Sequence, residues 1–185
     1  IGELDDVLYF VNLATETNGQ VNMKAEWIPN SYLVYFVTDV EKDTDNRNIV
    51  GDPDDLQPIR ATFDSTSATY PNATFKGYSL LGWTETQNGK TVDYEVGTVI
   101  DNLRSEPEDS ITLYAVWSAW EYTLVVSKDD GIESATASNS SVKTGQEVDI
   151  AASVLTGYTW GGWDTSASFA TFNSSSLTQR IVIGA

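Results

Sequence analysis

Cysteine and histidine are both absent from the 185 residues of this chain. Without cysteine, the protein can form neither a disulfide framework nor a thiolate metal site. Without histidine, it lacks the commonest general base, the commonest zinc and copper ligand, and every Ser–His or Cys–His catalytic device. Catalysis would have to rest on a carboxylate pair or a Ser–Lys arrangement, and the acidic residues lie outside the apolar runs that raise a carboxyl pKa. We therefore predict that the chain is not an enzyme.

Positive charge is also scarce, since 10 basic residues stand against 27 acidic ones and the formal net charge is −17. Such a surface repels phosphate backbones and anionic lipids, so we expect no nucleic-acid partner. No stretch reaches the ~18 apolar residues of a membrane span, so no membrane insertion is expected in this segment. The first residue is Ile, which suggests an internal fragment, and the lack of cysteine fits a bacterial protein outside the cytoplasm.

Two sequence elements recur along the chain. The first is the motif Gly-Tyr-x-x-x-Gly-Trp, which occupies residues 77–83 and 157–163. The second is a strand-like run that ends in Trp and is followed by a Tyr-led run. It occupies residues 21–27 and 32–37 and recurs 90 positions later, at 111–117 and 122–127. Recurrence of whole elements in one order indicates repeated structural units.

The positions of these elements predict three parts. Residues 1–30 would be the C-terminal part of a preceding repeat or an N-terminal cap, 31–119 a complete module with an acidic insertion at 38–62, and 120–185 a divergent module. Within residues 111–117, apolar side chains alternate with their neighbours, which is the period of two typical of a half-buried strand. We expect a mainly β chain whose modules lie end to end, with short hinges at 29–31 and 118–119.

These elements resemble the internalin-type B-repeat family, also called the Listeria–Bacteroides repeat. Its members run from a Tyr-led strand through the Gly-Tyr-x-x-x-Gly-Trp core to a closing strand of the form Leu-Tyr-Ala-x-Trp, and Tyr32, 77–83 and 113–117 follow that order. Residues 120–185 resemble the divergent branch of the family. The resemblance implies small β-grasp-like or sandwich-like modules in tandem in bacterial surface proteins, which mostly act as spacers, with adhesion or signalling roles suggested for some.

The motif residues are predicted to be structural. In each copy the first Gly would allow a tight turn, the second would let a neighbouring chain approach closely, and the aromatic rings would fill a small core. The residues assigned this role are Gly77, Tyr78, Gly82, Trp83, Trp117, Gly157, Tyr158, Gly162 and Trp163.

The acidic insertion offers a candidate metal site. Its alternating oxygen side chains at Asp39, Glu41, Asp43 and Asp45 suit a hard cation such as Ca²⁺, which takes six to eight oxygen ligands. The EF-hand pattern is not met, because Thr44 stands where that loop requires Gly and Val50 where it requires Glu. A solvated acidic loop is the alternative interpretation.

Aromatic side chains outside the motif offer a candidate ligand surface. Trp120, Tyr122, Trp160 and Tyr35 could form a platform that stacks on sugar rings, and packing in cores or between repeats is the favoured alternative.

The sequence as a whole predicts a non-catalytic spacer or stalk segment of a bacterial cell-surface, cell-wall or secreted protein, with adhesion as a candidate second role. Its expected partners are neighbouring repeats and a host or cell-wall glycan or protein. Two alternatives stay open, namely a carbohydrate-binding module that uses exposed aromatic side chains and a linker stiffened by Ca²⁺. No other cofactor is expected.

Overall fold

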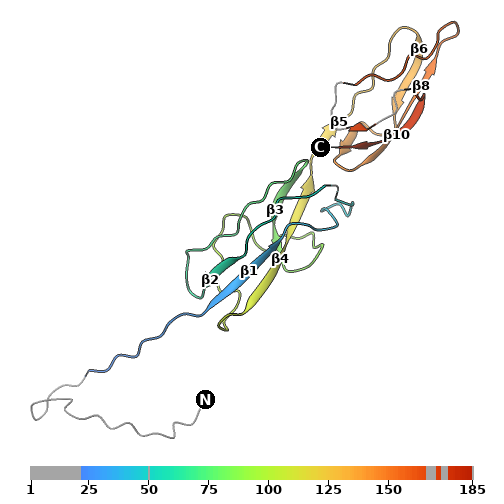
Figure 1. Ribbon diagram of the computed structural model, residues 1–185. Coiled ribbons are helices and arrows are strands. Elements are labelled where there is room, and N and C mark those ends of the chain that lie inside the picture. Colours follow the sequence, from blue (N-terminus) through green and yellow to red (C-terminus); the bar gives the residue numbers. More distant parts are fainter. Residues whose placement is uncertain (1–21, 50, 166–169, 172–174, 185) are drawn as a thin grey trace, which may run out of the picture.

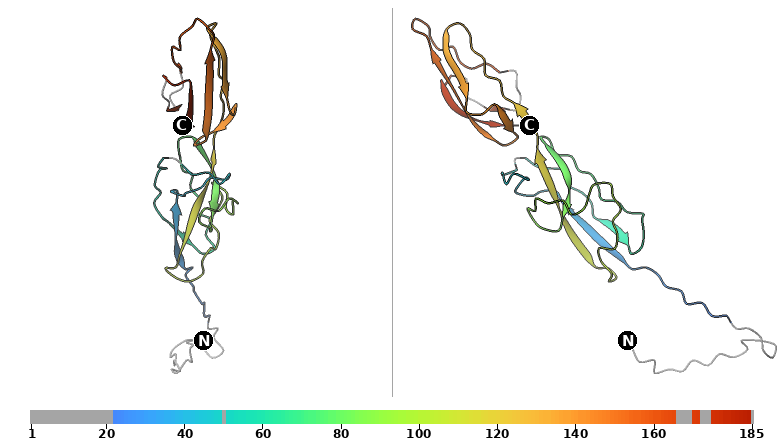
Figure 2. Two further views of the ribbon diagram at one scale, coloured as in Figure 1. Left: turned by 90° about the vertical axis from the view of Figure 1, so that its right-hand side faces the viewer. Right: turned by 180° about the vertical axis from the view of Figure 1, so that it is seen from behind.

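The chain folds entirely through β-strands and loops in the residues that the structure describes. The computed structural model describes residues 22–49, 51–165, 170–171 and 175–184. Figure 1 shows the strands in two groups that follow one another along a common axis, and Figure 2 shows that this elongated shape persists from other sides. We call residues 31–119 the first strand group and residues 120–184 the second. The prediction of a mainly β chain is confirmed.

The first strand group contains one four-stranded sheet. Its strands are β1 (Ser31–Val37), β2 (Ile59–Thr62), β3 (Tyr78–Thr84) and β4 (Ser110–Ala119), arranged in the order β2-β1-β4-β3. Strands β1 and β4 run parallel, whereas the other two pairs are antiparallel. Because β4 lies inside the sheet, it has a hydrogen-bonded neighbour on each side.

Alternating apolar residues explain why β4 occupies that position. Ile111, Leu113, Ala115 and Trp117 are all buried on the core face, as their spacing predicts. Val116 is buried as well, so both faces of β4 are covered near its end. The rings of Phe75 and Trp117 meet edge to face in the core, with centroids 5.5 Å apart.

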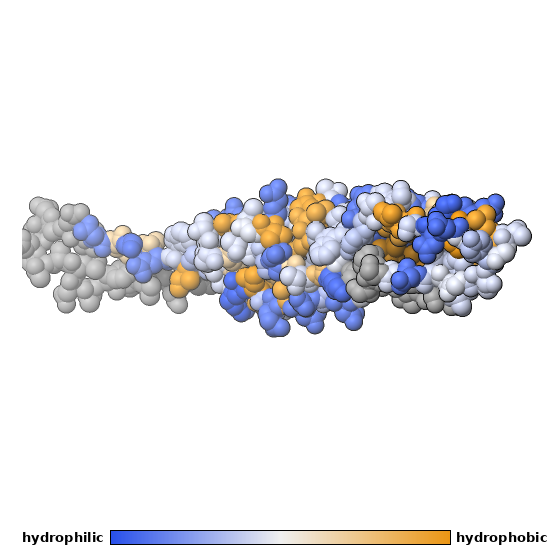
Figure 3. Space-filling view, turned by 90° about the horizontal axis from the view of Figure 1, so that it is seen from above, coloured by the Kyte–Doolittle hydropathy of each residue, from blue (hydrophilic) through white to orange (hydrophobic). Residues whose placement is uncertain are grey.

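The second strand group has two smaller sheets. A pair consists of β5 (Glu121–Thr123) and β7 (Ser141–Lys143). An antiparallel sheet in the order β6-β8-β10-β9 contains β6 (Ile132–Ala137), β8 (Glu147–Val154), β9 (Ala170–Thr171) and β10 (Thr178–Ile183). The second strand group has its own hydrophobic core, which shares no residue with the core of the first group. The buried members of this second core are Val142, Val148, Ile150, Ile181 and Ile183. Figure 3 shows hydrophilic side chains over the surface of both groups, and apolar patches are interspersed among them in each group.

The first copy of the repeated motif forms the turn into β3 and most of that strand. Gly77 has a positive φ of 84°, which glycine adopts without strain, and Tyr78 and Trp83 are buried. The β3–β4 pairing shifts by one residue between Leu80 and Gly82, which marks a bulge. A Cβ atom at Gly82 would lie 2.4 Å from Val92 and 2.6 Å from the Tyr94 carbonyl oxygen, so only glycine fits there.

The second copy of the motif is placed differently. Gly157 and Gly162 again have positive φ, and Trp163 packs, partly buried, against the second core. Tyr158, however, is 60% exposed, whereas its counterpart Tyr78 is 3% exposed. The two motif glycines therefore keep a positive φ in both copies, but the motif forms a strand and its tyrosine joins a core only in the first.

Substitution of Gly82 by alanine should lower the free energy of unfolding by about 2 kcal/mol, because the backbone of Tyr94 must move to admit the methyl group. Chemical denaturation followed by tryptophan fluorescence would measure this. Gly161→Ala is the matched control, since a Cβ there has open space within 4 Å, and it should change stability little. Equal effects at both positions would contradict this account of the motif.

Candidate functional site

The acidic segment folds back onto the protein around a buried carboxylate. Asp43 is 2% exposed, and its Oδ1 accepts hydrogen bonds from the backbone N–H groups of Asp45 and Arg47, both at 2.9 Å. The guanidinium of Arg47 donates to Oδ2 from Nε at 3.1 Å and from Nη2 at 2.6 Å. A buried charge is tolerated when it is paired and fully hydrogen-bonded, and both conditions are met here.

The loop is also fixed to the central strand of the first group. The backbone N–H of Thr44 donates to the carbonyl of Trp117 at 3.0 Å. In return, the indole Nε1 of Trp117 donates to the carbonyl of Thr38 at 2.9 Å. These two bonds hold the acidic loop against the end of β4, where the first strand group passes into the second.

Asp45 carries the loop across to the second strand group. Its Oδ2 lies 2.6 Å from Nζ of Lys143 in β7 and 3.1 Å from Nη2 of Arg47. The hydrogen bond from Lys143 lowers the pKa of Asp45 below its usual value, with further lowering from the nearby positive charges. Asp45 is therefore ionised at neutral pH and joins the two groups by a charge-assisted hydrogen bond.

A second contact between the groups is formed by Thr144, which is 2% exposed. Its hydroxyl donates to the carbonyl of Gly77 at 2.8 Å, and its backbone N–H donates to the carbonyl of Trp120 at 3.1 Å. The N–H of Trp120 also donates to Gly77, at 2.8 Å. The first glycine of the motif thus accepts hydrogen bonds from both the linking residue and the second group.

We call the ion pairs that link Asp43, Arg47, Asp45 and Lys143 in turn, together with the hydrogen bonds of Thr144, the junction clasp. Lys143, Thr144 and Arg47 were missed by the sequence reasoning. Arg47 offered a signal, because it lies two residues after the last of the four candidate carboxylates, but Lys143 lies 98 positions from Asp45 and nothing local links the two.

The four carboxylates proposed to bind Ca²⁺ do not come together as a ligand set. No cluster of three or more acidic side chains suited to a metal occurs in the part of the chain that the structure describes. Asp39 and Glu41 are exposed, whereas Asp43 and Asp45 are bound by the cations of Arg47 and Lys143. A cation at these two carboxylates would have to displace both basic side chains.

The four aromatic residues proposed as a platform lie in different settings. Tyr35 is 42% exposed on the outer face of β1, and Tyr122 packs, partly buried, against the second core. Trp160 packs edge to face on Trp163, with centroids 5.4 Å apart. Trp120 is 47% exposed and donates its indole N–H to the hydroxyl of Ser79 at 2.9 Å.

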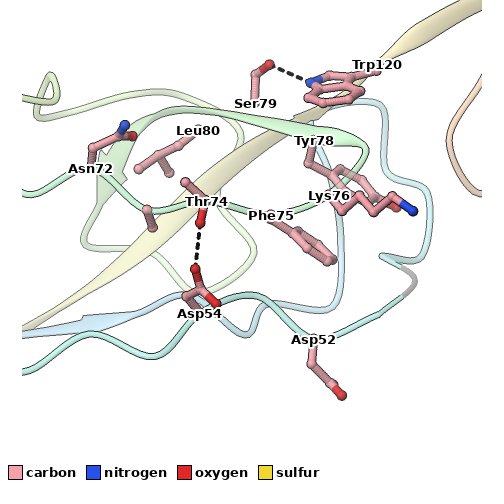
Figure 4. A pocket seen from close by; sticks show the side chains of 11 residues that line it. Asp52, Asp54, Asn72, Thr74, Phe75, Lys76, Tyr78, Ser79, Leu80 and Trp120 are labelled. Carbon is pink, nitrogen blue, oxygen red and sulfur yellow. Dashed lines mark hydrogen bonds between the residues drawn. The ribbon is translucent and has the colours of Figure 1, made fainter. Parts of the chain in front are cut away.

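Trp120 overlooks an open hollow of about 710 Å³ on the first strand group. Figure 4 shows its ring above Tyr78 and Lys76, with Asp52 and Asp54 on the opposite side. The hydroxyl of Thr74 donates to the carboxylate of Asp54. The complete lining consists of Asp52, Asp54, Asn72, Ala73, Thr74, Phe75, Lys76, Tyr78, Ser79, Leu80 and Trp120.

Comparison with known proteins gives one match. Residues 32–116 match the family described as the Listeria-Bacteroides repeat domain, which is the family that the motifs resemble. No curated protein and no solved structure matches the sequence. Among the described residues, no helix is long and apolar enough to cross a membrane.

Substitution of Asp43 by asparagine should lower the free energy of unfolding by about 3 kcal/mol, because it breaks a buried ion pair and leaves Arg47 without its main partner. Thermal or urea unfolding would measure the loss. Asp39→Asn removes the same charge from an exposed position and should change stability by less than about 0.5 kcal/mol. If both variants unfold alike, the loss reflects net charge and not the clasp.

Proposed function

We propose that this chain, whose residues 32–116 belong to the Listeria-Bacteroides repeat domain family, acts as a stiff, non-catalytic spacer in a bacterial surface or secreted protein. Repeats of this family are associated with bacterial surface proteins, which supports a place outside the cytoplasm. In this role the chain would hold a ligand-binding or adhesive part of its parent protein at a distance. The observation that carries the proposal is the direct, clasped junction between the two strand groups.

The covalent connection at this junction is very short. Strand β4 ends at Ala119 and β5 begins at Glu121, so Trp120 alone separates them. The proposed hinge at 118–119 lies within the strand, paired with Tyr78 and Ser79 of β3. Because extended backbone paired on a neighbour bends little, the second group continues the direction of the first (Figure 1).

The junction clasp adds contacts beside that connection. The Asp45–Lys143 bond comes from the acidic loop, and the Thr144–Gly77 bond comes from the turn that begins the motif. Two bonds from separate loops resist rotation about a single linking residue better than either does alone. A cleft of about 550 Å³ beside them is lined mainly by polar residues of both groups, so the groups meet there through polar side chains rather than through a shared core.

The pKa shifts of the carboxyl groups also support a non-catalytic role. Where a carboxyl pKa is shifted, as at Asp45, Glu108 and Asp149, it is lowered by a basic partner. A general acid at neutral pH requires the opposite shift. These carboxylates therefore act as partners in ion pairs.

Stiffness of the junction can be measured directly, because the chain has no native cysteine. Spin labels at Thr66→Cys and Thr136→Cys would place one probe on an exposed position of each strand group. Double electron–electron resonance should give one narrow distance distribution at neutral pH. Asp45→Asn should broaden it, and so should a pH well below 3.8, because the clasp is present while Asp45 is ionised and is lost when it is protonated.

Asp39→Asn in the labelled protein is the matched control, since it removes one exposed acidic charge that lies outside the clasp. It should leave the distribution unchanged. A broad distribution in the unmutated protein at neutral pH would show free motion between the groups and would rule out a stiff spacer.

A second candidate function is glycan binding at the hollow under Trp120. The observation in its favour is an exposed indole ring beside carboxylates, an amide and an ammonium group, which can stack on a sugar ring and bind its hydroxyl groups. The ligand would be a host or cell-wall glycan, which gives the spacer an adhesive role.

Trp120→Ala should weaken binding to insoluble peptidoglycan or to a soluble cello-oligosaccharide, measured by pull-down and by NMR titration. The loss in affinity should be roughly tenfold or more, by analogy with aromatic side chains that stack on nucleic-acid bases, where each ring contributes on the order of 1–3 kcal/mol. Trp27→Ala is the control, since Trp27 is 74% exposed and outside the hollow. Absence of binding by the unmutated protein, or equal losses in both variants, would exclude this site.

A further inference from the structure

The first and the last strand of the first strand group lie side by side. Strand β1 begins at Ser31, where the chain enters the group, and β4 ends at Ala119, where the chain leaves it. The two strands are hydrogen-bonded neighbours in the sheet. Figure 1 shows residues 22–30 joining β1 at one end of the group and β4 passing into the second group at the other end. Tension along the chain across this group therefore acts first on the β1–β4 pair.

The parallel direction of β1 and β4 decides how that tension acts. Their starting ends lie together, because the backbone N–H of Glu108 donates to the carbonyl of Ser31 and that of Leu33 donates to the carbonyl of Asp109, both at 2.9 Å. Tension pulls β1 toward its start and β4 toward its end, so the strands are drawn past each other along their length. Hydrogen bonds between parallel strands run across that direction at even spacing. They are therefore loaded together and not one after another.

Each of the two strands is also held on its other edge. Strand β1 pairs with β2, and β4 pairs with β3 over most of its length, from Tyr78–Ala119 to Thr84–Tyr114. For β4 to slide along β1, it must also slide along β3 or pull β3 with it. Both strands are thus interior strands of the sheet, and neither can move without breaking a second ladder.

Side-chain packing opposes the same movement. Val34 and Phe36 of β1 and Ile111 and Leu113 of β4 are buried in one core. Because side chains alternate between the two faces of a strand, a slip by one residue would turn every one of these groups away from the core. A small displacement along the strands therefore costs core contacts as well as hydrogen bonds.

A buried indole extends the connection beyond the paired residues. The ladder between β1 and β4 ends at Val37–Tyr114. Thr38 follows directly, and its carbonyl accepts a hydrogen bond of 2.9 Å from Nε1 of Trp117, three residues farther along β4. Thr38 is 3% and Trp117 1% exposed. Withdrawal of β1 toward its start moves Thr38 away from Trp117, so tension stretches this bond along the strands.

The rest of the first group lies outside the path of tension while β1 and β4 stay paired. Residues 38–109 connect the two strands and include β2, β3 and the acidic loop. The hollow under Trp120 is lined by residues 52–80 apart from Trp120 itself, so nearly all of its lining belongs to this part. The shape of the hollow and of the first motif copy is thus separated from a force that passes along the chain.

We propose that the first strand group withstands pulling force along the chain, and that the parallel β1–β4 pair with the Trp117–Thr38 hydrogen bond supplies the resistance. This function rests on the proposed spacer role, because a spacer is stretched between the parts that it separates. It differs from stiffness in its location. Stiffness concerns bending at the junction, whereas resistance to force lies within the first group.

The direction of pulling tests the proposal in a chain with no native cysteine. Handles attached at Ile28→Cys and Thr123→Cys pull the two strands past each other. Handles at Ile28→Cys and Glu106→Cys pull at the common starting end of β1 and β4 and separate the strands one bond at a time. All three positions are exposed. In optical tweezers the first protein should unfold at a force several times that of the second, and equal forces would overturn the proposal.

The bond of Trp117 is tested by a matched pair of tryptophan variants. Trp117→Phe removes the hydrogen bond to Thr38. Trp83→Phe removes a similar one, since the fully buried Trp83 donates from Nε1 to the carbonyl of Pro71 at 3.0 Å, within residues 38–109. Both variants should lose similar stability in urea. Forced unfolding depends on the barrier to unfolding, so only Trp117→Phe should markedly lower the force between positions 28 and 123.

Equal losses of force in the two tryptophan variants would show that force follows overall stability, which would contradict the role given to Trp117. If Trp117→Phe does not fold, the two pulling directions in the chain with both tryptophans decide the proposal. The spin-label measurement at the junction is independent of both. A narrow distance distribution with equal forces would overturn resistance to force alone, and a broad distribution with direction-dependent forces would overturn the stiff spacer alone.

Discussion

Strand β4 is the element on which the rest of this structure depends, because it is bonded on both sides and also leads directly into the second strand group. Its core-facing residues bring β1, β3 and the surrounding loops together, and the fully buried Trp117 closes the core at the end near the junction. The carbonyl and the indole of this same residue hold the acidic loop. Packing of one strand therefore fixes both the core and the position of the contacts that cross to the next group.

Opposite charges meet at the junction between the two strand groups. The acidic excess of the sequence suggests either solvation or metal binding, but the carboxylates of Asp43 and Asp45 are each bound by a basic side chain of the protein itself. Asp43 is buried and orders the loop, whereas Asp45 is partly exposed and reaches across. A buried ion pair is valuable here for geometry more than for net stability, because its desolvation offsets much of its attraction.

The two strand groups differ in how completely their strands are covered. In the first, β1 has a neighbour on each edge and its inward residues are buried. In the second, the corresponding segment is covered on one edge in the described residues, and the second motif copy leaves Tyr158 at the surface.

The sequence by itself determined the strands, because alternation is local information. The prediction of a mainly β chain, the burial of Trp83 and Trp117, and the close approach at Gly82 all followed from residues within a few positions of one another. The family match covers one repeat, at 32–116, so the division into a partial, a complete and a divergent repeat stays a prediction. Only the tertiary structure decided the partners of Asp45, Trp120 and Thr144. Their partners Lys143, Ser79 and Gly77 lie 98, 41 and 67 positions away, and no local pattern records which distant surfaces meet once the strands have paired.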